Sequence, residues 1–157
     1  MGIVLADTRQ HAGKHDEKHA DMAASGYEPK FSKLYVGDYQ MPPSVAVDTK
    51  RSIAELASNV WTQHDRFRRE LVRAQEAGVR LVILVENTHG VTDLVTLAQW
   101  VEPQREFNRR KNAQRRIYGS TLAKACATMQ EKYGCEFMFC KPGEAGQAVL
   151  RILGADL

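Results

Sequence analysis

This sequence has few cysteines, no long apolar run and no excess of glycine or proline, and each absence excludes a class of protein. The three cysteines, Cys126, Cys135 and Cys140, are odd in number and show no CxxC spacing. They therefore argue against a disulfide framework or a zinc site and favour reduced thiols in a cytosolic protein. No apolar run approaches the ~20 residues that a transmembrane helix needs, and the first residues lack a basic segment and meet an acid at Asp7, unlike a signal peptide. We expect a cytoplasmic protein without membrane association. The sequence contains no Gly-rich phosphate-binding loop, so we expect no small-molecule cofactor.

The composition that remains is typical of one globular domain. The chain has 157 residues, of which 43% are hydrophobic and 26% are charged, enough to bury roughly two-thirds of the unfolded surface. The net charge is only +3, but residues 105–116, REFNRRKNAQRR, hold six basic residues and one acid, which leaves the rest of the chain at −2. Such a local concentration indicates contact with a polyanion, with an ordinary solvated charge run as the alternative.

Short apolar runs alternate with helical patterns along the chain, which predicts an α/β layer architecture. Ser52 is the expected N-cap of one helix, and Glu55 would complete a capping box. The basic stretch 105–116 is expected to be a mobile arm or the start of a helix. Strands are expected at 2–6, 37–40, 45–50, 80–87 and 135–141, a turn at 41–44, and helices at 11–26, 52–60, 65–78, 91–101, 120–134 and 143–153.

The stretch KLYVGDYQMPPSVAVDTKRSIAEL places an acid on each side of a Pro-Pro turn. If the turn MPPS joins two antiparallel strands, Asp38 lies opposite Val47 or Asp48, depending on whether the loop is even or odd. The odd register sets Asp38 and Asp48 on one face with Cβ atoms ~5 Å apart, and Lys50 shares that face because strand side chains alternate. Two carboxylates so close need a cation or a shared proton. With Mg²⁺ and a lysine, they have the parts needed for phosphodiester hydrolysis.

Two further acids end apolar runs, Asp7 after GIVLA and Glu86 after LVILV. Functional groups gather beyond the carboxyl ends of strands in open α/β sheets, so Asp7 is expected to add a metal ligand from a neighbouring strand. Acids are also frequent at strand ends for backbone reasons alone. On spacing alone, a metal site and an ordinary strand end remain alternatives.

Over a longer range, the segments ADTRQ, LYVGDY, VAVDTKRSIAELASN, DRFRREL and LVILVEN follow one another in an order that resembles the nuclease domain of XPF-type structure-specific endonucleases. That family has a DTRE-like strand end, a GD-x(n)-ERK-x(3)-D motif, an RF or RL helix and an LLIE-like strand. The resemblance covers residues 3–87 and continues more weakly to the last helix, and it is strongest to stand-alone versions carried by phages and prophages. It implies a restriction-endonuclease-like fold of the PD-(D/E)xK group. This is a mixed β-sheet flanked by helices in a single domain over 1–157, with a basic insertion at about 101–118.

The resemblance also implies an activity: cleavage of flapped, forked or Holliday-junction DNA in repair, recombination or phage DNA processing, with Mg²⁺ or, in its place, Mn²⁺. By position, Asp38 matches the GD aspartate, and Asp48 and Lys50 match the acid and lysine of the ERK motif. Asp7 would assist the two aspartates in holding the metal. Lys50 would position the attacking water or steady the phosphate.

Basic residues are the expected DNA contacts, and the family arrangement implies a homodimer in a bacterial or phage-infected cell. Three departures from the family pattern are Asp48 for glutamate, Thr49 for arginine and Gln10 for glutamate. Two other functions stay open, a weak or inactive DNA-binding subunit and a protein-interaction or inhibitor module. The candidate DNA contacts are Arg9, Arg51, Arg66, Arg105, Arg109, Arg110, Lys111, Arg115 and Arg116.

Overall fold

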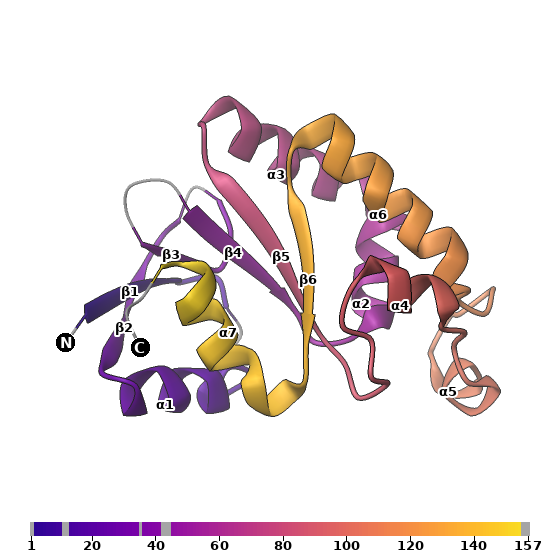
Figure 1. The fold of residues 1–157 in the computed structure, drawn as a ribbon, viewed down its shortest axis with the longest axis horizontal. Coiled ribbons are helices and arrows are strands. Elements are labelled where there is room, and N and C mark those ends of the chain that lie inside the picture. The colour runs from indigo at the N-terminus through magenta and orange to yellow at the C-terminus, as the bar shows by residue number, and fades with distance from the viewer. Residues whose placement is uncertain (1, 11–12, 35, 42–44, 155–157) are drawn as a thin grey trace.

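The computed structural model describes residues 2–10, 13–34, 36–41 and 45–154. Across these residues, six strands form one mixed sheet in the order β2-β1-β3-β4-β5-β6, with helices on both of its faces (Figure 1). The predicted mixed sheet flanked by helices is therefore confirmed. The strands are β1 (Gly2–Asp7), β2 (Tyr27–Ser32), β3 (Tyr39–Met41), β4 (Val45–Lys50), β5 (Arg80–Glu86) and β6 (Glu136–Cys140). The helices are α1 (Asp16–Ala24), α2 (Ile53–Val60), α3 (His64–Glu76), α4 (Leu94–Gln99), α5 (Gln104–Arg109), α6 (Gly119–Tyr133), the 3₁₀ turn η1 (Pro142–Glu144) and α7 (Ala145–Ile152).

The sheet changes character at β4. On one side, β3 runs antiparallel to both β1 and β4, while β2 runs parallel to β1. On the other side, β4, β5 and β6 are parallel to one another. Strand β4 therefore joins an antiparallel hairpin to a parallel layer.

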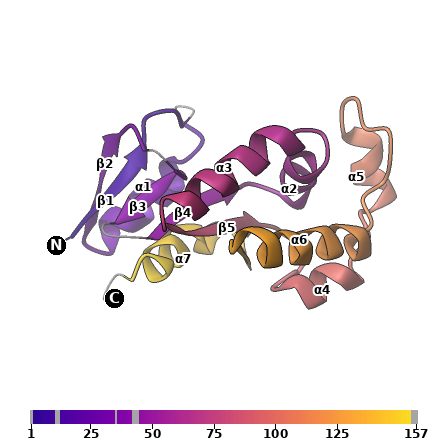
Figure 2. The ribbon, with the colours of Figure 1, turned by 90° about the horizontal axis from the view of Figure 1, so that it is seen from above.

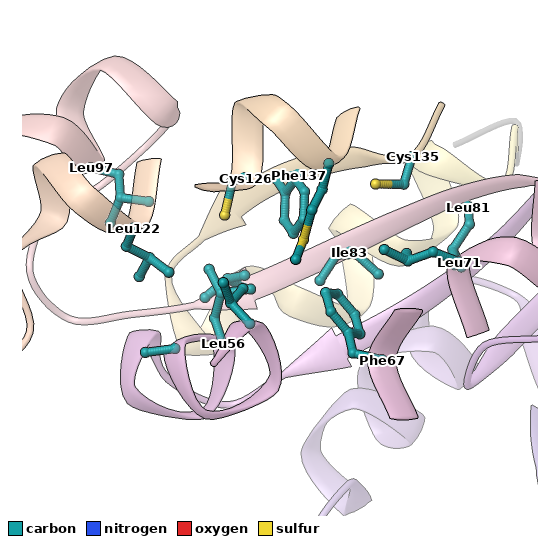
Figure 3. Packing of buried hydrophobic residues seen from close by; sticks show 14 of the residues in the cluster. Leu56, Phe67, Leu71, Leu81, Ile83, Leu97, Leu122, Cys126, Cys135 and Phe137 are labelled. Atoms are coloured by element: carbon teal, nitrogen blue, oxygen red, sulfur yellow. The ribbon is translucent and has the colours of Figure 1, made fainter. Parts of the chain in front are cut away.

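Alternation along β4 and β5 divides the core between the two faces of the sheet. Val47 and Leu84 point into a cluster beneath α1 and α7. Ala46 and Ile83 point into a larger cluster formed with α2, α3 and α6, where Leu56, Phe67, Ile83, Cys126 and Phe137 meet (Figure 3). Strand β5 is thus covered on both faces, as its apolar run predicts.

Strand β2 was not predicted. Its residues are all half-buried or exposed, and it contains Pro29 between Glu28 and Lys30. Proline in a strand is tolerated at a sheet edge, where its missing N–H removes no ladder bond. Because β2 is the outermost strand beside β1, its sequence lacks the apolar signal that reveals a central strand.

The predicted ends of several elements need correction. Helix α1 begins at Asp16, after Gly13, Lys14 and His15, so the expected helix from residue 11 is shorter; residues 11–12 lie outside the described residues. Residues 42–44 of the expected turn also lie outside them, but the flanking residues Met41 and Val45 pair.

The capping box forms only in half. Ser52 accepts a hydrogen bond from the Glu55 backbone N–H at 3.0 Å. The Glu55 carboxylate, however, accepts from the backbone N–H of Arg51 at 3.0 Å rather than from Ser52. The helix keeps its predicted cap, while the acid secures the preceding residue.

Two expectations from the composition concern the membrane and the thiols. In the described parts of the chain, no helix combines the length and the apolar character that crossing a bilayer requires. Cys126, Cys135 and Cys140 are all free, as expected. Burial raises the pKa of Cys126 to about 12, so this thiol is inert at neutral pH.

Candidate active site

Strand register brings three acids to one face of the sheet. Ala6 pairs with Tyr39, and Tyr39 pairs with Val47, in antiparallel register. Asp7 and Asp48 follow Ala6 and Val47, and Asp38 precedes Tyr39, so the three acids lie side by side. The backbone N–H of Asp7 donates to the carbonyl of Asp38 at 2.7 Å. All three acids face the side opposite the cluster that holds Ala6, Tyr39 and Val47.

The carboxyl groups of Asp38 and Asp48 are in direct contact, which the odd register predicts. Burial and the negative charge of Asp48, to which Asp38 is also hydrogen-bonded, raise the pKa of Asp38 well above its usual range. Thr49 opposes this shift, because its backbone N–H and its hydroxyl donate to Asp38 Oδ2 at 2.7 and 3.0 Å. Thr49, which replaces the family arginine, therefore orients Asp38.

Lys50 is held in the same place from three directions. Its ammonium lies 2.9 Å from Asp48 Oδ2, donates to Asn59 Oδ1 at 3.4 Å and lies 5.6 Å from the centre of the Phe67 ring. Burial alone would lower the pKa of Lys50, but the adjacent Asp48 carboxylate, with Glu70 and Asp38, raises it. At neutral pH Lys50 is therefore a fixed positive charge beside the carboxyl pair.

Asp7 lies beside the pair, and its two oxygens bond to other groups. Its Oδ2 accepts from Arg9 Nε at 2.7 Å, and its Oδ1 accepts from the backbone N–H of Leu34 at 3.4 Å. Arg9 also donates to the carbonyl of Leu34 at 2.8 Å. Glu86, the other acid at a strand end, faces the opposite side of the sheet and pairs with Lys18 of α1 at 2.7 Å.

A fourth acid of the site, Glu70, was not predicted. It comes from α3, and its Oε1 accepts from the backbone N–H of Gly37 at 3.2 Å. Burial and the charge of Asp48 raise the pKa of Glu70. Gly37 has φ +76°, and a Cβ there would lie 3.0 Å from the carbonyl oxygen of Val47, so only glycine fits before Asp38.

These groups line a cleft of about 790 Å³, which we call the carboxylate cleft. Its wall contains the acids Asp7, Asp38, Asp48 and Glu70 together with Lys50. The predicted DNA contacts Arg9, Arg51 and Arg66 also line it, and so do Arg69 and Arg73 of α3, which the sequence analysis did not single out. An anion entering this cleft meets basic side chains at its rim.

The basic insertion is a closed loop around a buried acid. An antiparallel bridge joins Val101 to Tyr118, and Glu102, which is 2% exposed, accepts two hydrogen bonds from Arg110 at 2.7 and 3.0 Å. Arg116 donates to the Glu102 carbonyl. Arg110 and Arg116 therefore hold the loop together, whereas the other four predicted contacts in it are exposed. These four are Arg105, Arg109, Lys111 and Arg115.

The carboxylates of the site determine whether it suits a divalent cation. In the residues that the structure describes, no three His, Cys, Asp or Glu side chains converge into a metal cage. A magnesium ion does not need one, because proteins often bind it through one or two carboxylates plus waters and substrate phosphates. The touching carboxyls of Asp38 and Asp48 supply such ligands, and a cation would relieve the repulsion between them. The residues present fit a divalent ion.

Comparisons with known proteins identify the family and the fold. The family model for the ERCC4 domain matches residues 6–151. Two solved structures, XPF from the archaeon Aeropyrum pernix and the same protein in complex with DNA, are similar to the chain at 19% sequence identity, with TM-scores of 0.66 and 0.68. The alignments cover 96% and 98% of this chain but 63% and 64% of those chains, so this chain spans less than two-thirds of their length. No curated protein matches it in sequence. At this identity, the two structures establish the restriction-endonuclease-like fold.

Proposed function

The chain belongs to the ERCC4 domain family, and from that premise we propose that it is a metal-dependent, structure-specific endonuclease that hydrolyses phosphodiester bonds in branched DNA. The observation that carries the proposal is the row of Asp7, Asp38 and Asp48 on one sheet face, with Lys50 held 2.9 Å from Asp48. A buried pair of adjacent carboxyls destabilises a fold unless a cation or a shared proton neutralises it.

In this proposal, Asp38 and Asp48 hold Mg²⁺ or Mn²⁺, and Asp7 assists from β1. When bound, the ion supplies Lewis-acid polarisation of the scissile phosphate and activation of water. Thr49 orients Asp38 through its two hydrogen bonds. Glu70 fixes the backbone of Gly37, which precedes Asp38, and so acts as a positioning residue.

Lys50 would stabilise charge rather than accept a proton. Attack of water on phosphorus adds negative charge to the non-bridging oxygens, and a preorganised cation stabilises that charge. The raised pKa of Lys50 keeps it protonated, and Asn59 fixes its direction. Of the two roles expected for Lys50, steadying the phosphate is the one that its surroundings support.

The exposed basic residues would bind the DNA backbone. Arg51 and Arg66 lie at the carboxylate cleft, and Arg105, Arg109, Lys111 and Arg115 are exposed on the basic loop. Phosphate contacts of this kind position DNA without reading its sequence, as a shape-selective enzyme requires. The homodimer, the phage or bacterial source and the role in repair or recombination rest on the family resemblance alone, and sedimentation would test the dimer.

A panel of labelled flap, fork, Holliday-junction and duplex DNAs tests the activity. With Mg²⁺ or Mn²⁺ we expect cleavage of one branched geometry, none in EDTA and none by Asp48→Asn. Glu131→Gln, an exposed acid-to-amide change on α6, is the matched control and should cleave normally. A wild type that binds these DNAs but is as silent as Asp48→Asn would instead identify a non-catalytic DNA-binding subunit.

A second measurement tests the metal without relying on activity. Mn²⁺ should raise the melting temperature of the wild type and of Glu131→Gln, because a ligand that binds only the folded state stabilises it. It should not do so for Asp38→Asn or Asp48→Asn. Equal stabilisation of all four proteins would place the metal elsewhere.

A further inference from the structure

A second hollow lies between α2 and the basic loop. Its volume is about 750 Å³, and two aromatic side chains, Trp61 at the end of α2 and Tyr118 at the end of the loop, line it. Trp61 is 44% exposed and Tyr118 is 51% exposed, so both rings offer surface to a ligand. We call this hollow, bounded by Ala57, Trp61, Lys111, Arg115 and Tyr118, the aromatic groove. The fold places α2, α6 and the α5 loop beside one another (Figures 1 and 2).

The charge of the groove selects an anionic ligand. Arg110, Lys111, Arg115 and Arg116 line it, and no acid is among its described lining residues. Arg110 and Arg116 are engaged with Glu102, whereas Lys111 and Arg115 are exposed. Proteins bind single-stranded nucleic acid with aromatic rings, on which the bases stack, and with nearby exposed basic side chains, which neutralise the phosphates.

The groove is continuous with the carboxylate cleft. A third hollow of about 380 Å³ shares Trp61 with the aromatic groove and shares Arg66 and Arg69 with the cleft. Ser58 lines both the groove and the cleft. A strand that leaves the cleft can therefore follow α2 and α3 over basic side chains to the groove; Figure 2 shows the two helices in succession.

We propose that the aromatic groove binds an unpaired nucleotide of the substrate, with its base on Trp61 or Tyr118 and its phosphate near Lys111 and Arg115. Bases inside a duplex are stacked and cannot reach a protein ring without being extruded. The groove therefore favours DNA that carries a single-stranded arm next to the cleavage site. This choice of substrate class rests on the proposed function, whereas the binding of single strands by the groove does not.

Binding in EDTA tests the groove without cleavage. The probe is a fluorescein-labelled oligothymidylate of about ten nucleotides, read by anisotropy, with a blunt duplex of equal length beside it. At least one of Trp61→Ala and Tyr118→Ala should weaken single-strand binding by roughly tenfold, in the range found for base–aromatic stacking, and leave duplex binding unchanged. Trp61→Phe should retain most of the affinity. Phe31→Ala, which removes another exposed ring at the far edge of the sheet, is the matched control.

Wild-type affinity in both alanine variants, or an equal loss for duplex and single strand, would overturn the groove as a single-strand site. Thermal unfolding identifies a variant that has merely lost its fold, and Trp61→Leu or Tyr118→Leu, which keeps an apolar side chain without a ring, then decides in its place. If branched DNA is cleaved but substitution of Trp61 and Tyr118 has no effect on single-strand binding, this inference is wrong and the proposed endonuclease function stands. Single-strand binding through Trp61 without cleavage of any DNA would do the reverse.

Discussion

At the scale of single residues, the protonation of Asp38 links the candidate site to pH. Burial and the neighbouring Asp48 raise the pKa of Asp38 in the folded state, while the unfolded chain ionises near the ordinary value of about 4. Folding therefore takes up a proton at pH values between the unfolded and the folded pKa of Asp38. The fold loses stability progressively as the pH rises from the unfolded pKa of Asp38 through its folded pKa. Below both pKa values this cost is absent.

We predict that Asp38→Asn stabilises the metal-free protein at neutral pH. Removing the like-charge repulsion should raise the melting temperature by roughly 2–4 °C, the shift that about 1 kcal/mol produces in a domain of this size. The gain should shrink as the pH falls and vanish below about 3, where Asp38 is protonated in both states. Differential scanning calorimetry in EDTA at several pH values measures it. A gain that does not depend on pH would contradict the repulsion between Asp38 and Asp48.

Glu70→Ala, which removes the acceptor of the Gly37 N–H, should weaken metal binding while leaving the fold intact. The side chain secures Gly37 next to Asp38, and removing a group that supports a metal ligand commonly costs 10–100-fold in affinity. Isothermal titration calorimetry with Mn²⁺ measures this change in affinity. Glu76→Gln, an exposed change on the same helix, should bind as the wild type does, and so distinguishes this role from a general effect of charge.

The site could be predicted from the sequence only where its geometry is local. Strand alternation and the spacing around one turn reduce the choice to two registers, one of which places Asp38, Asp48 and Lys50 together. Glu70 and Asn59 reach the site because α3 and α2 pack across the sheet, and no short-range pattern contains that information. Their sequence surroundings read as ordinary polar positions on amphipathic helices.

At the scale of elements, the basic loop depends on the buried carboxylate of Glu102. It accepts hydrogen bonds from Arg110 and from the backbone N–H of Ile117, the latter at 3.0 Å. Arg110 and Arg116 were predicted to contact DNA, because a charge run does not reveal which of its members turn inward. The structure assigns them to the loop's own stability, a role the composition conceals.

Glu102→Ala should loosen this loop. Leaving buried donors without an acceptor costs about 1–3 kcal/mol, so we expect a lower urea midpoint and faster tryptic cleavage between residues 105 and 116. Glu106→Ala removes an exposed acid of the same loop, which contacts His89, and should change both measurements little. Unaltered proteolysis of the Glu102 variant would show that the ring of contacts is not what orders the loop.

Edge elements were the hardest to predict. Strand β2 carries few buried side chains, so its pairing with β1 comes from backbone hydrogen bonds that any sequence can form. Central elements such as β5 and α3 were predicted close to their observed limits, because both bury apolar residues at the expected period.

At the scale of the whole molecule, positive charge extends from the carboxylate cleft to the basic loop. Arg51, Arg66 and Arg69 lie at the cleft, and the exposed residues of the loop continue the surface. The strand order itself could not be predicted from the sequence, since the hairpin and the parallel layer could be joined in several ways. The family resemblance supplied what local patterns could not.

DNA binding should depend steeply on salt, and the loop should account for part of that dependence. Each phosphate contact contributes a slope of about −0.9 to the logarithmic salt dependence. Replacing Arg105, Arg109, Lys111 and Arg115 together by alanine should therefore reduce the slope by roughly 3–4, measured by anisotropy with duplex DNA. A variant with Lys124 and Arg151 replaced, two exposed cations elsewhere, should keep the wild-type slope.

Three residues separate Met41 from its partner Val45, and their number limits which insertions and deletions this hairpin can accept. Because neighbouring side chains of a strand project to opposite sides, losing or gaining one residue there would turn Asp38 away from Asp48 while the hairpin survived. Such an insertion or deletion would abolish the activity without unfolding the protein. Natural and engineered variants of this hairpin should therefore tolerate new residues in the turn far more readily than a new length.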